Sequence, residues 1–147
     1  MLCAMLTSTL GRRAAAAVAL SAALLLSVAA CSPDDDSSSS QGATTLDAAA
    51  FGERAATDGV VVLDVRTPEE FASGHLVGAV NINLESGSFE SDIAGLDQGA
   101  PYAVYCRSGN RSGQAMGIMQ DAGFTDVAHL DGGIVAWQEA GGQIVTD

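Results

Sequence analysis

A run of four large apolar residues, Val60–Leu63, limits the folds open to this chain more than any other feature of its sequence. Such a run is typical of a strand buried on both faces, as in a parallel sheet that helices cover on either side. Further short segments with strand-like composition follow at 78–82, 102–105 and 127–130. We therefore predict a central, mostly parallel sheet.

Helical patterns separate these segments. One helix is expected to begin after Thr67, because Thr67 is a good N-cap, Pro68 suits the first helical position and Glu70 completes a capping box. Further helices are expected at about 89–96, 112–122 and 134–140. Strands that alternate with helices predict an α/β fold of three layers, with helices on both faces of the sheet.

The first thirty residues resemble an export signal. Their charge is confined to Arg12 and Arg13, and residues 14–30 carry no charge. The order Val28-Ala29-Ala30-Cys31 resembles the lipobox of bacterial lipoproteins. We predict a signal peptide at 1–30 and lipidation of Cys31 by acyl chains such as palmitate; the alternative is an uncleaved anchor. Both interpretations place the rest of the chain on the extracytoplasmic side of a bacterial cell membrane.

Residues 31–43 are rich in Ser and Asp and contain no large apolar side chain. They are expected to form a disordered, acidic tether, followed by a folded domain at 44–147.

Charge and composition exclude several partners. The net charge of −12 becomes −14 when the signal peptide, which holds two arginines and no acid, is removed. Such a surface repels phosphate backbones, so nucleic acid is not an expected partner. The chain has no lysine, and its cysteines and histidines are too scattered for a structural zinc site. We expect no metal and no cofactor, and the sequence predicts no oligomeric state.

Cys106 is the thiol that would remain after export, because Cys3 leaves with the signal peptide and Cys31 is lipidated. It follows the predicted strand 102–105, at the edge of a parallel sheet where ligands bind. The segment after it is polar or small throughout: Arg107, Ser108, Gly109, Asn110, Arg111 and Ser112. Loop amides, a helix N-terminus and two arginines all favour a thiolate. The segment therefore predicts an anion-binding loop around a nucleophilic Cys106.

Other residues near this loop have two interpretations each. Asp64 and Arg66 end the first predicted strand and either orient the loop or form a structural ion pair, in which Arg66 contacts Asp64 or Glu70. The structural pair is favoured. Ser108 and Ser112 either donate hydrogen bonds to the sulfur or cap the following helix. The sequence does not choose between these two roles.

The segment 106–112, CRSGNRS, resembles the active-site loop of single-domain rhodaneses, a family of sulfurtransferases. Residues 71–79 and 129–137 resemble the motifs upstream and downstream of that loop in the family. The first departs from the common pattern at Val77, and the second at Ile134 and Ala136. The resemblance extends over residues 44–147 and implies a rhodanese-like fold.

The resemblance also implies a mechanism, in which Cys106 carries a persulfide from a small anionic sulfur donor to a thiol or cyanide-like acceptor. The loop amides, Arg107 and Arg111 would hold the donor, which is thiosulfate or a persulfide. His75 would be a structural residue rather than a general base, and Trp137 is expected to pack in the core.

Loop length separates this pattern from rhodanese-like phosphatases and arsenate reductases, in which five residues stand between the Cys and the Arg. Here four residues separate Cys106 from Arg111, and the shorter loop suits one sulfur atom better than a tetrahedral oxyanion. Two further hypotheses remain. One is an extracytoplasmic thiol redox sensor that uses Cys106. The other is a protein-interaction module, although rhodanese domains with that role usually lack the Cys.

Overall fold

The computed structural model describes residues 43–146. The predicted signal peptide, Cys31 and residues 32–42 of the predicted tether lie outside the described residues. Ala43, the last residue of that predicted tether, is the first residue of a strand. Within residues 43–146, no helix has the length and apolar character needed to cross a bilayer.

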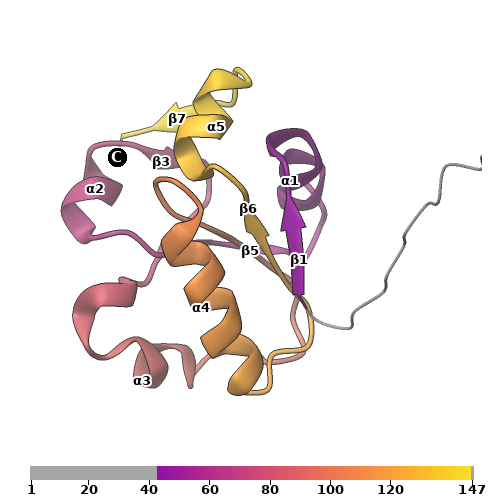
Figure 1. Cartoon of the computed structure of the whole chain (residues 1–147), viewed down its shortest axis with the longest axis vertical. Coiled ribbons are helices and arrows are strands. Elements are labelled where there is room, and N and C mark those ends of the chain that lie inside the picture. The colour runs from indigo at the N-terminus through magenta and orange to yellow at the C-terminus, as the bar shows by residue number, and fades with distance from the viewer. Residues whose placement is uncertain (1–42, 147) are drawn as a thin grey trace, which may run out of the picture. The chain divides into compact units, whose positions relative to one another are not determined.

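A parallel sheet of five strands lies at the centre of the described domain (Figure 1), in the order β1-β6-β5-β2-β4. The strands are β1 (Ala43–Leu46), β2 (Val61–Asp64), β4 (Val80–Asn81), β5 (Tyr102–Tyr105) and β6 (Val127–Leu130). The predicted parallel sheet is confirmed. β5 and β6 have the predicted bounds, and β2 is shifted by one residue.

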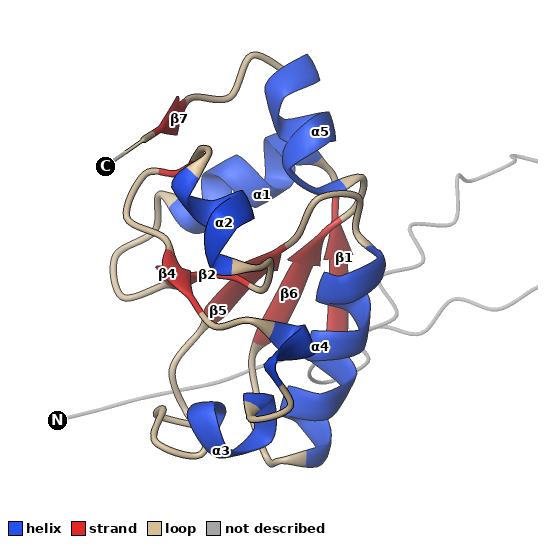
Figure 2. Ribbon diagram, turned by 90° about the vertical axis from the view of Figure 1, so that its left-hand side faces the viewer, coloured by secondary structure: helices blue, strands red, loops and turns tan. Residues whose placement is uncertain are grey.

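Helices cover both faces of this sheet (Figure 2). On one face, α1 (Ala48–Ala55) and α5 (Gly133–Glu139) contribute Phe51 and Ile134 to a buried cluster. On the other, α3 (Phe89–Ile93) and α4 (Asn110–Asp121) contribute Phe89 and Met119 to a second cluster. The three-layer α/β arrangement predicted from the sequence is therefore confirmed.

The side chains of β5 alternate between these two clusters, as the two-residue period of a strand requires. Ala103 and Tyr105 belong to the cluster on the α1 and α5 face. Tyr102, Val104 and then Cys106 belong to the cluster on the α3 and α4 face. The parity of the strand thus directs the thiol toward the face that α4 covers.

Smaller elements complete the domain: α2 (Pro68–Ala72), β3 (His75–Leu76), the 3-10 helix η1 (Leu84–Ser86) and β7 (Ile144–Val145). β3 and β7 form a separate antiparallel pair. The capping box predicted for α2 is present in both halves, because the Glu70 amide donates to the Thr67 hydroxyl and the Thr67 amide donates to the Glu70 carboxylate.

Two boundaries differ from the predictions in ways that matter for the site. α4 begins at Asn110, two residues before the predicted start, because Gly109 serves as its N-cap with a φ of 92°. Arg111 and Ser112 therefore belong to the first turn of α4 rather than to the preceding loop. β1 and α1 were not predicted individually, since β1 is short and its central residues, Thr44 and Thr45, are exposed.

Candidate active site

Cys106 lies directly after β5, and its thiol forms the floor of the turn that leads into α4. The sulfur is almost fully enclosed, with the residue 1% exposed, and it is a free thiol. The amide of Gly109 donates a hydrogen bond to Cys106 Sγ over 3.1 Å. The sulfur is therefore shielded from bulk solvent by the turn.

The start of α5 holds the other side of this turn. The amide of Ile134 donates to the carbonyl of Cys106 over 2.8 Å, and the amide of Val135 donates to the carbonyl of Arg107 over 3.3 Å. These two hydrogen bonds fix the peptide groups that follow Cys106 and Arg107, and the Gly109 amide faces the sulfur in the turn that results. The turn is thereby held in the orientation that an anion site needs.

Gly133 makes this close approach possible. Its φ is +59°, and a Cβ atom built on it would lie 2.4 Å from the carbonyl oxygen of Cys106. No side chain fits in that space without moving the turn. The Gly132-Gly133 pair within the downstream motif therefore has a physical reason, which is the contact between the backbones of α5 and the Cys106 turn.

Two opposing influences act on the Cys106 thiol. Burial raises its pKa, but hydrogen bonds from the hydroxyl and amide of Ser112 and from the amides of Ser108 and Gly109 outweigh burial, so the pKa is lowered overall. The direction agrees with the sequence prediction. The predicted loop amides are among the causes that lower the pKa, whereas the two nearby arginines are not among the leading ones.

Arg111 is engaged by two carboxylates. Its guanidinium forms a two-pronged contact with Glu70, at 2.7 Å and 2.8 Å, and a further contact with Glu85 at 3.0 Å. The hydrogen bond from Arg111 lowers the pKa of Glu70 to about 2, against a smaller effect of burial. The charge of Arg111 is thus compensated, and the side chain links α4 to α2 and η1.

Arg107 has a different environment. It is exposed at the rim of the turn, and across residues 43–146 it is the one arginine whose side chain makes no ion pair or hydrogen bond. Arg54 pairs with Asp126, and Arg66 pairs with Asp64, each at 2.6 Å. Of the two arginines predicted to hold a donor, only Arg107 has an uncompensated charge.

Asp64 and Arg66 form a buried structural pair. Arg66 also donates to the carbonyl of Gly74 over 2.7 Å and lies over the ring of Tyr105, 5.6 Å from its centroid. Burial raises the pKa of Tyr105, and a hydrogen bond to Asp64 adds to this effect. The favoured interpretation is confirmed, with Asp64 as the partner of Arg66, while Glu70 pairs with Arg111.

His75 and Trp137 have the structural environments predicted for them. His75 is buried, its Nδ1 lies 3.0 Å from the carbonyl oxygen of Phe71, and its ring stacks on the Phe71 ring at 3.7 Å. Trp137 packs edge to face against Phe51 and donates from Nε1 to the carbonyl of Gln143.

Sequence reasoning missed one group beside the site. His129 on β6 is buried, with Nδ1 3.2 Å from Ser112 Oγ and Nε2 3.1 Å from Thr45 Oγ1. A polar residue inside the buried strand 127–130 was the available signal. Its partners lie on other elements, so the sequence alone did not identify them.

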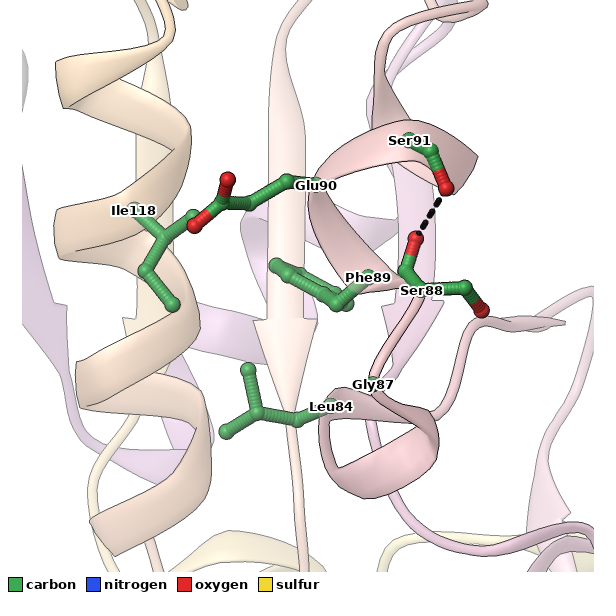
Figure 3. A pocket seen from close by; sticks show the side chains of 7 residues that line it. All are labelled: Leu84, Gly87, Ser88, Phe89, Glu90, Ser91 and Ile118. Atoms are coloured by element: carbon green, nitrogen blue, oxygen red, sulfur yellow. Dashed lines mark hydrogen bonds between the residues drawn. The ribbon is translucent and has the colours of Figure 1, made fainter.

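A cavity of about 440 Å³ lies away from this turn, between α4 and the segment that contains η1 and α3 (Figure 3). None of residues 106–112 lines it; the lining residues are Leu84, Gly87, Ser88, Phe89, Glu90, Ser91 and Ile118. Among residues 43–146, no three His, Cys, Asp or Glu side chains gather as a metal site.

Comparison with known proteins identifies the family of this domain. Residues 47–140 match the model of the rhodanese-like domain. The chain is 40% identical over 81 residues to thiosulfate sulfurtransferase GlpE of Pseudomonas putida, which covers 55% of this chain and 72% of that protein. It is 36% identical over 84 residues to the uncharacterized protein slr1261 of Synechocystis, which covers 57% of this chain but only 46% of that protein. The crystal structure of a rhodanese-related protein from Thermoplasma volcanium superposes with a TM-score of 0.63 at 30% identity, over 71% of this chain and 99% of that one.

Proposed function

Since the chain belongs to the rhodanese-like domain family, and membership of that family supports sulfurtransferase activity at the family level, we propose that Cys106 carries the transferred sulfur as a persulfide. The observation that best supports this is the geometry of the turn. The carbonyls of Cys106 and Arg107 accept hydrogen bonds from α5, while the Gly109 amide points at Cys106 Sγ from 3.1 Å. A set of amides around one sulfur suits a thiolate, and it suits the outer sulfur of a persulfide equally well.

The proposed reaction has two displacements. The Cys106 thiolate attacks the outer sulfur of the donor, a new S–S bond forms, and the donor's S–S bond breaks. The electron pair of that bond leaves with the donor, as sulfite from thiosulfate or as a thiolate from a persulfide. A thiol or cyanide-like acceptor then attacks the outer sulfur and releases the Cys106 thiolate. The enzyme is restored without any cofactor.

We propose that Arg107 holds the anionic end of the donor. Its exposed guanidinium has no carboxylate partner, whereas Arg111 is already bound by Glu70 and Glu85. Arg111 then serves mainly to hold the first turn of α4 in place. One free arginine favours a donor of low negative charge, so persulfides should compete well with the thiosulfate dianion.

An arsenate reductase or phosphatase function is less well supported. The loop has four residues between Cys106 and Arg111, and that arginine is engaged by two carboxylates instead of being free to bind an oxyanion. Redox sensing would require a partner thiol, because residues 43–146 contain no second cysteine that could resolve an oxidised Cys106. A protein-interaction module would have no use for the hydrogen bonds around the thiol.

Steady-state sulfur transfer tests the proposal. The full chain should form thiocyanate from thiosulfate and cyanide, and Cys106→Ser should abolish this activity while circular dichroism stays unchanged. Arg107→Gln should raise the KM for thiosulfate about tenfold, the value of one charged hydrogen bond. Arg54→Gln removes the same charge from a surface pair with Asp126 and should leave the KM unchanged. Sulfur transfer retained by Cys106→Ser would exclude the mechanism.

We also propose that Cys31 is lipidated and tethers the domain to the extracytoplasmic face of the membrane. The lipobox-like order of residues 28–31 supports this proposal. In bacteria fed labelled palmitate, the protein should carry the label, and Cys31→Ser should lose it. A protein that stays in the membrane without ever carrying label would instead be held by an uncleaved anchor.

A further inference from the structure

The cavity beside α3 continues along α4 as a groove. The cavity of about 440 Å³ and an adjoining one of about 250 Å³ share Glu90 and Ile118 among their lining residues, and the second extends to Asp121 and Ala122. We call the two together the α3–α4 groove. Leu84 and Ile118, both half-buried, give it apolar surface. An apolar side chain of another molecule would lose contact with water by lying against them.

Two carboxylates line this groove without a partner. Neither Glu90 nor Asp121 forms an ion pair or a side-chain hydrogen bond within residues 43–146. Glu90 belongs to α3 and extends toward Ile118 of α4 (Figure 3), and Asp121 is the last residue of α4. The groove therefore combines apolar surface with unpaired negative charge from both of the helices that flank it.

The position of Asp121 is electrostatically unfavourable for its own helix. The last carbonyl groups of a helix carry partial negative charge, so a helix C-terminus favours Lys or Arg and disfavours a carboxylate. α4 has no basic residue in its last turn and ends on Asp121. Glu90, by contrast, lies in the first turn of α3, where a carboxylate is favourable. A cation beside Asp121 would be attracted both by its carboxylate and by the end of α4.

The chain itself does not supply that cation. It contains no lysine, and its arginines are accounted for elsewhere: two in the predicted signal peptide, three paired with carboxylates of the domain, and Arg107 at the rim of the Cys106 turn. Residues 32–42 contain three Asp and no basic residue. A second copy of the chain would bring the same excess of acidic side chains. The cation must therefore come from a different molecule.

We infer that the α3–α4 groove is a docking site for a protein segment that carries a lysine or arginine beside an aliphatic residue. The aliphatic side chain would lie against Leu84 and Ile118, and the cation between Glu90 and Asp121. Ile118 follows Arg111 by about 10 Å along the axis of α4, so a protein docked in the groove would also be within reach of the Cys106 turn. The docking itself does not depend on sulfur transfer.

Binding of a synthetic peptide to the full chain tests the chemistry of the partner. The probe is Ala-Leu-Lys-Leu-Ala, acetylated, amidated and labelled with an uncharged dye, and fluorescence anisotropy measures its Kd. Replacing its Lys by Gln should raise the Kd about fivefold, the value of two exposed ion pairs. Replacing both Leu by Ser should weaken binding as well. Added salt should weaken the binding of the Lys peptide more than that of the Gln peptide.

Variants of the chain test the place of binding. Glu90→Gln combined with Asp121→Asn should raise the Kd of the Lys peptide about fivefold. Glu53→Gln combined with Asp58→Asn is the matched control, because it removes the same charge from two exposed, unpaired carboxylates in and after α1, on the opposite face of the sheet. This control should leave the Kd unchanged. Equal losses in both double variants would mean that net charge, and not the groove, attracts the peptide, and would overturn the inference.

Two further results would contradict it. Equal Kd values for the Lys and Gln peptides would show that the groove does not recognise a cation. Spermine that displaces the Lys peptide, with a Leu-to-Ser peptide bound as tightly as the original, would identify a small polycation as the ligand instead of a protein segment. Because all these measurements record binding, they can be repeated in Cys106→Ser and stand even if the chain transfers no sulfur.

Discussion

The N-termini of α4 and α5 meet at the same turn and begin in the same way, but their free amides serve different purposes. Each helix follows a glycine with positive φ, 92° at Gly109 and 69° at Gly132. At α5, the first amides donate to the carbonyls of Cys106 and Arg107. At α4, the amide of its N-cap Gly109 donates to the sulfur of Cys106.

The difference shows that a helix N-terminus binds an anion only where its amides are left without backbone partners. α5 satisfies the carbonyls of the turn and so determines the direction of the turn's amides. α4 and the turn then present those amides to the thiol. One helix shapes the site, and the other stabilises the charge in it.

The largest expected effect comes from pushing the start of α5 away from the Cys106 turn. In Gly133→Ala, the new methyl group would lie 2.4 Å from the carbonyl oxygen of Cys106, at a φ of +59°. We expect a loss of about 3 kcal/mol in the free energy of unfolding and at least about a hundredfold loss of sulfur transfer. Urea denaturation and the thiocyanate assay measure the two quantities.

Gly141→Ala is the matched control, because Gly141 has a similar φ, +82°, but a Cβ there meets nothing within 4 Å. It should cost only the backbone strain of about 1 kcal/mol and leave activity intact. Equal losses in both variants would mean that positive φ, and not the contact with the turn, is what requires Gly133.

A smaller effect distinguishes what a side-chain hydroxyl contributes to the lowered pKa of Cys106 from what the backbone amides contribute. The hydroxyl and the amide of Ser112 both lower the pKa of Cys106, whereas Ser108 lowers it through its amide. At pH 7, Ser112→Ala should therefore slow alkylation of Cys106 several-fold, since a raised pKa leaves less thiolate. Ser108→Ala should leave the rate unchanged, and a matching decrease there would contradict this division of roles.

The smallest effect concerns the ion pair that holds the first turn of α4. Arg111→Gln should lower the free energy of unfolding by about 1 kcal/mol at pH 7, within the range for a partly exposed pair with two-pronged geometry. Glu70 has its pKa lowered from 4.5 to about 2 in the folded protein. The pair's contribution is therefore present above pH 4.5 and is lost as the pH falls toward 2.

Urea denaturation of wild type and Arg111→Gln across that range measures the effect. The two stability curves should converge as the pH falls toward 2. A difference that persists at that pH would show that packing of the arginine side chain, rather than its charge, is what the variant loses.

The sequence predicts those parts of the fold that depend on local patterns. β5 and β6 have the predicted bounds, and the capping box of α2 forms from Thr67 and Glu70 as predicted. In each case the decisive residues are neighbours in the chain. The position of Cys106 at the end of β5 follows from the same local pattern.

The rest depends on pairings between distant residues. Arg111 contacts Glu70 and Glu85, which lie 41 and 26 residues away in the chain. The loop sequence therefore does not reveal that carboxylates compensate the charge of Arg111. His129 meets Ser112 and Thr45 on two other elements. The early start of α4 follows from the positive φ of Gly109, which lies so close to β6 and α5 that a Cβ there would be 3.1 Å from the Gly132 nitrogen.

The most direct test of the central claim is the intact mass of the reduced protein before and after exposure to thiosulfate or a persulfide donor. We predict a gain of one sulfur atom that disappears when cyanide is added and does not occur in Cys106→Ser. An unchanged mass with every donor, or a gain that persists in Cys106→Ser, would contradict the account of Cys106 as the sulfur carrier.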